Sequence, residues 1–151
     1  MIKYSTFNLK KMLCNDSYNN PSQTKTINEM VGTPYSIRER FKMGGIGSPK
    51  MEIVSSSATI YSLLSLDHNT NYSSIELRPK GIILRFRSLL ETYALVIPFY
   101  KLTIFKGDIG VYSVYMDDYF VKVKADTKGI QKYFKRILDA KIASDPNQTY
   151  H

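Results

Sequence analysis

Apolar residues recur along the chain with two spacings, one typical of strands and one typical of a helix. Between Met51 and Ala125, short apolar runs alternate with polar positions, as in "IELRP" and "YFVKVKA". Alternation with period two places successive side chains on opposite faces of a strand. The sequence therefore predicts short strands near 51–56, 58–64, 75–79, 81–88, 92–97, 101–106, 111–116 and 119–125.

The helical spacing occurs near the C-terminal end, in "DTKGIQKYFKRILDAKI". Ile130, Tyr133, Phe134, Ile137 and Leu138 follow one another at i, i+3, i+4, i+7 and i+8, which is one face of a helix. Asp126 or Thr127 can cap its start. We predict a helix over about 127–142 that buries this stripe on the strands.

The N-terminal third lacks both spacings. We expect residues 1–34 to be a flexible lead-in or docking arm, because "NDSYNNPSQTKT" (15–26) is polar and typical of a loop. Residues 35–50 are a transitional segment, in which Tyr35, Ile37 and Phe41 are expected to anchor a turn of helix. The domain itself is predicted at 51–143, followed by a tail at 144–151.

Composition narrows the class of protein. The 21 basic and 13 acidic residues leave a net charge of +8, which favours anionic partners and solubility. The lone Cys14 cannot form an intramolecular disulfide, and no Cys/His cluster is present, so no metal or cofactor is expected. Because no secretory signal is recognisable and the longest apolar run, "YALVIPFY", cannot span a bilayer, we expect a cytoplasmic protein.

Four cations are the candidate binding residues. In a strand over 81–88, Arg85 and Arg87 point the same way as Ile83, and Ile82, Leu84 and Phe86 point to the core. Lys122 and Lys124 form a second pair of this kind. Either pair can be a solvated outer face or an anion-binding site, since paired cations can hold a phosphate or carboxylate.

Catalytic residues are not recognisable. His68 lies in a predicted loop, His151 is the last residue, and Cys14 lies in the lead-in. The carboxylates of Glu76 and Glu91 are isolated along the sequence, and Asp117-Asp118 is typical of a turn. We therefore expect no enzyme, with an unrecognised enzyme as an alternative.

Two stretches resemble bacterial pleckstrin-homology-like (PH-like, GRAM-type) domains: "LRPKGIILRFR" (77–87) and "YALVIPFYKLTIFKG" (93–107). The hairpin and helix in "YFVKVKADTKGIQKYFKRIL" (119–138) follow in the same order. The resemblance implies a mainly β fold, a bent barrel of about seven strands closed by the C-terminal helix, and a role in binding. The strands expected over 51–64 contain no Lys or Arg, so inositol-phosphate recognition is not expected.

The sequence thus favours a non-enzymatic binding or scaffolding domain that recognises a protein segment or an anionic surface. Single-stranded nucleic acid is the alternative ligand, because 12 Tyr, 7 Phe and a basic balance suit stacking in a charged groove. A membrane surface as partner and assembly into a homo-oligomer both stay open.

Overall fold

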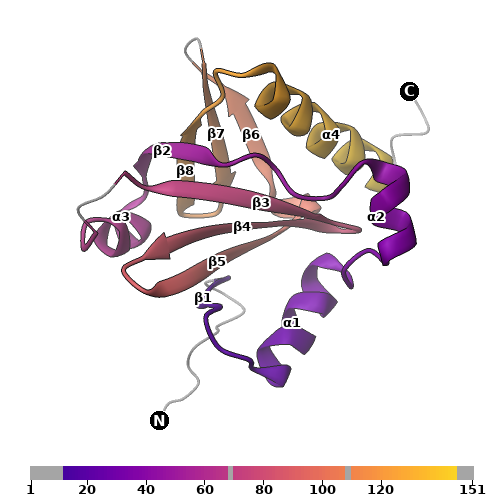
Figure 1. Ribbon diagram of the computed structural model, residues 1–151, viewed down its shortest axis with the longest axis horizontal. Coiled ribbons are helices and arrows are strands. Elements are labelled where there is room, and N and C mark those ends of the chain that lie inside the picture. Colours follow the sequence, from indigo (N-terminus) through magenta and orange to yellow (C-terminus); the bar gives the residue numbers. More distant parts are fainter. Residues whose placement is uncertain (1–11, 68–69, 108–109, 146–151) are drawn as a thin grey trace.

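A computed structural model describes residues 12–67, 70–107 and 110–145. Within them, eight antiparallel strands form one open sheet in the order β1-β5-β4-β3-β2-β8-β7-β6 (Figure 1). The strands are β1 (Leu13–Asn15), β2 (Met51–Ser56), β3 (Tyr72–Arg78), β4 (Gly81–Ser88), β5 (Glu91–Pro98), β6 (Thr103–Lys106), β7 (Val111–Met116) and β8 (Tyr119–Lys124). The helices are α1 (Pro21–Val31), α2 (Ile37–Met43), α3 (Ala58–Leu64) and α4 (Lys128–Ser144), with the 3-10 helix η2 (Phe99–Lys101). The prediction of a mainly β fold with a C-terminal helix is confirmed.

Strands β3, β4 and β5 form a meander of tight hairpins. Arg78 pairs with Gly81 across the first turn, and Ser88 pairs with Glu91 across the second. Gly81 has no space for a side chain, because an added Cβ would lie 2.3 Å from the Ile97 carbonyl oxygen. Pro98 is the last residue of β5, as expected for a residue that cannot donate a ladder hydrogen bond.

Strand β2 joins the two halves of the sheet. It pairs with β3 through Met51 and Glu52 and with β8 through Ile53, Ser55 and Ser56. The register shifts between Ile53 and Ser55, and such an irregularity bends a strand. Figure 1 shows the consequence, since β3–β5 run across the direction of β6–β8.

Helix α4 confirms the predicted C-terminal helix. The Thr127 hydroxyl accepts a hydrogen bond from the Ile130 backbone N–H at 3.2 Å and caps its first turn. Ile130, Tyr133, Phe134 and Ile137 are buried in the main core, where the Phe134 ring stacks on Tyr112 with centroids 4.6 Å apart. Four of the five residues of the predicted stripe are therefore buried, whereas the fifth, Leu138, is exposed.

The strand expected over 58–64 is wrong, because these residues form helix α3. Ile60 and Leu64 are four residues apart and both buried, a spacing that places them on one face of this helix as it would on one face of a strand. The neighbouring prediction over 51–56 is confirmed as β2.

The loop expected over 15–26 is also wrong from Pro21 onward. Asn20 caps α1 by accepting a hydrogen bond from the Gln23 N–H at 3.1 Å, and Pro21 occupies the first turn. The helix buries Ile27 and Val31 in a second apolar cluster on the outer face of the sheet, with Ile83, Ala94, Val96 and Cys14. Ahead of it, β1 pairs with β5 and raises the strand count above the expected seven.

In the transitional segment a helix forms, but the expected anchors do not all pack. Tyr35 contacts the main core, whereas Ile37 and Phe41 are exposed on α2. The limits drawn between lead-in, transitional segment, domain and tail stay a prediction.

Candidate functional site

The two arginines of β4 lie on the outer face of the sheet, as the alternation predicted. Ile82, Leu84 and Phe86 belong to the main core, whereas Ile83 lies in the outer cluster under α1. Arg85 and Arg87 share the side of Ile83. Their surroundings nevertheless differ, because Arg85 is partly buried and Arg87 is exposed.

Arg85 is held by two carboxylates. Its Nε donates to Asp16 Oδ2 at 2.8 Å, and its Nη1 donates to Glu76 Oε1 at 2.6 Å. Asp16 follows β1 in the chain, and Glu76 lies on the neighbouring strand β3. The interpretation of Arg85 as a merely solvated side chain is therefore wrong, since it joins two segments of the fold.

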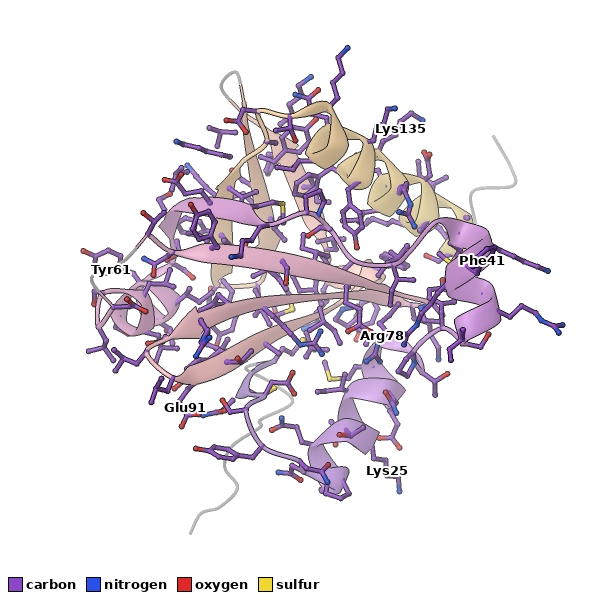
Figure 2. The ribbon with its side chains drawn as sticks, in the orientation of Figure 1. Lys25, Phe41, Tyr61, Arg78, Glu91 and Lys135 are labelled. Atoms are coloured by element: carbon purple, nitrogen blue, oxygen red, sulfur yellow. The ribbon has the colours of Figure 1, made fainter. Side chains whose placement is uncertain are left out.

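Glu76 also accepts from a second arginine. Arg78 Nε donates to Glu76 Oε2 at 2.6 Å, and Arg78 Nη1 donates to the Gly32 carbonyl oxygen at 2.8 Å and to Asn28 Oδ1 at 3.0 Å. Figure 2 places Arg78 where the sheet meets α1. Asp16, Arg85, Glu76 and Arg78 thus form one charged network that fixes β1 and α1 to β3 and β4. Glu76 is isolated along the sequence, but the fold places it between two arginines.

The network shifts the ionisation of its members. Burial works to raise the pKa of Glu76, but the hydrogen bonds from Arg85 and Arg78 outweigh it and lower that pKa below its usual value. Burial likewise works to lower the pKa of Arg85, and the bonds to Asp16 and Glu76 raise it. Both groups stay charged at neutral pH, so the network is a structural element with its charges satisfied.

Arg87 lies in a different environment, an open hollow beside the end of β4. The hollow has a volume of about 680 Å³ and is lined by the cations Lys50, Arg85 and Arg87 and by the carboxylate of Asp67. Lys50 Nζ lies 5.2 Å from the centre of the Tyr72 ring. In the part of the chain that the structure describes, the Arg87 guanidinium has no ion pair.

One exposed leucine lines this hollow, and other exposed apolar residues lie on neighbouring segments. Leu89, which lines it, and Leu90 form the β4–β5 turn and are 55% and 85% exposed. Leu89 also has a φ of 57°, a conformation that a leucine rarely adopts. Tyr61 and Leu66 are exposed on and after α3, and Figure 2 shows Tyr61 at the same end of the molecule as Glu91, the residue that follows the turn.

The predicted pair Lys122 and Lys124 lies elsewhere, on β8, separated from β4 by β2 and β3. Lys124 pairs with Glu52 at 3.4 Å, and Lys122 Nζ lies 5.9 Å from the centre of the Phe120 ring. The rings of Phe120, Tyr115 and Phe105 lie in a row. The ring centres of Phe120 and Tyr115 are 5.5 Å apart, and those of Tyr115 and Phe105 are also 5.5 Å apart. We call Phe105, Tyr115 and Phe120 the aromatic row. The structure does not bring the four candidate cations into one site.

The described residues give little support for a catalytic or metal site. Burial, with a smaller contribution from Asp16, raises the pKa of Cys14 to about 12, which leaves the thiol protonated and unreactive. Across residues 12–67, 70–107 and 110–145, no group of three or more His, Cys, Asp or Glu side chains could hold a metal ion. His68 and His151 lie outside the described residues.

Comparison with protein-family models, with curated proteins and with solved structures finds no match to this chain. The resemblance to PH-like domains therefore stays a prediction. Of the helices in the described residues, none has the length and apolar character needed to cross a membrane.

Proposed function

We propose that the chain is a non-enzymatic binding domain that docks on an anionic membrane surface with the end that carries the hollow. The observation that carries this proposal is the exposure of Leu89 and Leu90 on a turn directly after Arg87. Apolar side chains at a protruding turn can enter the boundary between headgroups and acyl chains. Cations beside them are attracted to anionic headgroups, by about 1 kcal/mol each near the surface.

Lys50 and Arg87 supply this attraction. Lys50 is exposed and Arg87 has no ion pair among the described residues, so neither gives up a strong internal partner on binding. Arg85 contributes less, because Asp16 and Glu76 already neutralise it. The proposed contact is thus modest in charge and depends on the leucines, which distinguishes it from recognition of one specific headgroup.

We further propose a PH-like fold for β2–β8 with α4, supported by the order of the elements. Without β1, the seven strands run β5-β4-β3-β2-β8-β7-β6, and the shift in β2 divides them into two halves. Helix α4 follows the last strand and buries Phe134 and Ile137 in the main core. This arrangement agrees with the bent sheet closed by a helix that the resemblance implies.

Co-sedimentation with vesicles tests the membrane proposal. The full chain should bind vesicles of phosphatidylcholine with phosphatidylserine and release them as salt is added, since screening weakens exposed charges. Arg87→Gln should weaken binding about fivefold, the equivalent of about 1 kcal/mol per cation. Leu89→Ser with Leu90→Ser should abolish it.

Matched controls lie on α4, where Lys135→Gln and Ile142→Ser change an exposed cation and an exposed apolar residue. Both variants should bind vesicles like the native chain. The proposal would be contradicted if vesicles of phosphatidylcholine alone bind as well as those with phosphatidylserine. It would also be contradicted if the α4 variants lose as much binding as the Arg87 and leucine variants.

The aromatic row favours a second candidate function, binding of single-stranded nucleic acid. Phe105 is 58% exposed, and Lys122 lies beside the row on the same face. Bases can stack on such rings without sequence preference, at about 1–3 kcal/mol per base. The test is binding of a fluorescent thymidine oligonucleotide to the native chain and to the Phe105→Ala variant. Binding to the native chain that the variant loses would establish this function in place of membrane docking.

A further inference from the structure

Helix α2 has no fully buried residue, although Met43 at its end packs partly on the main core. Its sequence is "IRERFKM", in which Ile37 and Phe41 are four residues apart and therefore share one face. These side chains are 84% and 88% exposed. Exposed apolar residues are common, but two large ones side by side on a fixed helix mark a contact surface.

The chain holds α2 firmly at its start. Ser36 Oγ accepts a hydrogen bond from the Glu39 N–H at 3.2 Å, and Glu39 Oε1 accepts one from the Ser36 N–H at 2.9 Å. This reciprocal capping box satisfies two backbone donors at the helix start. The hydrogen bonds from Ser36 also lower the pKa of Glu39, which keeps this carboxylate charged and engaged with its own backbone.

The end of α2 is held equally well. Gly44 adopts a left-handed conformation with a φ of 75°, and its N–H bonds back to the last turn. Arg136 Nη2 then donates to the Gly45 carbonyl oxygen at 2.6 Å, and the Tyr133 hydroxyl donates to the Ile46 carbonyl oxygen at 2.6 Å. Both donors belong to α4, so α2 is anchored to the packed part of the fold while its own apolar face stays open.

The charge on α2 indicates what covers this face. Arg38, Arg40 and Lys42 are exposed, and Glu39 is the acidic residue of the helix, which gives three positive charges minus one, or +2. Arg40 Nε donates to the Tyr35 carbonyl oxygen at 2.9 Å, so this cation is fixed in place. Two copies of α2 placed face to face would bring like charges together, which disfavours a second copy of the chain as the occupant.

We propose that α2 binds an acidic protein segment that inserts an apolar side chain between Ile37 and Phe41. Carboxylates of the segment then pair with Arg38 and Lys42 around this contact. Figures 1 and 2 place α2, with Phe41, at one end of the long axis and α3, with Tyr61, at the other. The choice of protein over membrane rests on the proposed function, because a bilayer held at the far end cannot also reach α2; the charge and apolar pattern of α2 do not depend on it.

A library of random peptides displayed on phage, selected against the full chain, tests the proposal. The selected peptides should be enriched in Asp and Glu around one Leu or aromatic residue. The double variant Ile37→Ser with Phe41→Ser should bind such a peptide about thirtyfold more weakly or worse, as expected for the loss of interface anchors. Arg38→Gln with Lys42→Gln should weaken binding and reduce its salt dependence.

The control is Leu89→Ser with Leu90→Ser, which alters the opposite end and should leave peptide binding unchanged. Circular dichroism should show that each variant folds, which is expected because the substituted side chains are exposed. If the α2 variants lose peptide binding and the Leu89→Ser, Leu90→Ser variant loses vesicle binding, each proposal is supported independently of the other. Vesicle binding can fail while peptide binding persists, so failure of one proposal is distinguishable from failure of the other.

Three results would overturn the inference. The first is a selection that returns no peptides, or peptides without acidic residues. The second is a dimer in sedimentation analysis that Phe41→Ser dissociates, which would make a second copy the occupant. The third is a loss of vesicle binding on Phe41→Ser, which would assign α2 to a membrane surface.

Discussion

Replacing Glu76 by glutamine should destabilise the fold, because this carboxylate joins the two arginines of the charged network. Arg78 Nε and Arg85 Nη1 each donate to it at 2.6 Å. An amide can still accept one of these bonds, but it carries no charge. Breaking a buried ion pair costs about 3–5 kcal/mol.

The expected cost is smaller than that range, because both arginines keep other acceptors. Arg78 still bonds to Asn28 and Gly32, Arg85 still bonds to Asp16, and the Arg85 side chain is 30% exposed. One charge-assisted hydrogen bond contributes about 1.5–3 kcal/mol, so we expect a loss of about 2–3 kcal/mol in the free energy of unfolding. For a domain of this size the midpoint of thermal unfolding should fall by about 4–12 °C.

The loss should depend on pH in a defined direction. The pKa of Glu76 is lowered in the folded chain, so its charge stabilises the fold above the pKa of the unfolded chain, about 4.3 for glutamate. This contribution disappears as pH falls through the lowered pKa and native Glu76 takes up a proton. Urea unfolding followed by circular dichroism should therefore show a large difference between native and variant chains at neutral pH and a shrinking one in acid.

Glu52→Gln is the matched control, since Glu52 pairs with Lys124 at 3.4 Å and both side chains are more exposed than that of Glu76. Such surface pairs contribute about 0–1 kcal/mol. The reasoning is refuted if Glu76→Gln costs no more than this control, or if its cost is the same at neutral and acid pH.

Three further predictions concern the core. Phe134→Ala should cost about 3–5 kcal/mol in urea unfolding, because Phe134 is fully buried; a loss below about 1 kcal/mol would contradict the packing of α4. Gly81→Ala should cost about 3 kcal/mol, because the new Cβ meets backbone and Val31, whereas Gly47→Ala has open space and should be nearly neutral; equal costs would be inconsistent with the close approach of β5. Cys14 should resist iodoacetamide at pH 8 until the chain unfolds, since its pKa is raised to about 12 by burial and Asp16, and rapid alkylation of the native chain would show that β1 is not seated on β5.

The elements that sequence predicted well are those with a clear periodic pattern of apolar residues. Phe134 and its neighbours on α4 repeat with helical spacing, and β4 alternates between core and outer face, so each pattern has one interpretation. Residues 58–64 failed because Ile60 and Leu64 are diluted by serines and fit a short strand as well as a helix. Asn20 and Pro21 indicate the start of α1. The polar residues after them obscured the helical spacing of Ile27 and Val31, the two apolar residues that the helix buries.

The charged network could be predicted only in part from the sequence. The two-residue turn between Arg78 and Gly81 sets the register that places Glu76 opposite Ile83 and diagonal to Arg85. That contact could have been found from the hairpin. Asp16 could not, because it lies 69 positions from Arg85 and is brought there by the pairing of β1 with β5. The exposure of Phe41 is equally invisible, since an apolar residue in a helical pattern is expected to pack.

The pairing of β1 with β5 has a consequence for synthesis of the chain. Leu13 pairs with Leu95, 82 positions later, whereas β3, β4 and β5 are joined by short turns. At about 5–20 residues per second, the ribosome makes β5 about 4–16 s after it has made β1. During that interval the first strand has no partner, and the polar run from Asn15 to Thr26 keeps the waiting segment in water. The composition that hides the N-terminal elements from sequence analysis is thus suited to protecting the nascent chain from aggregation.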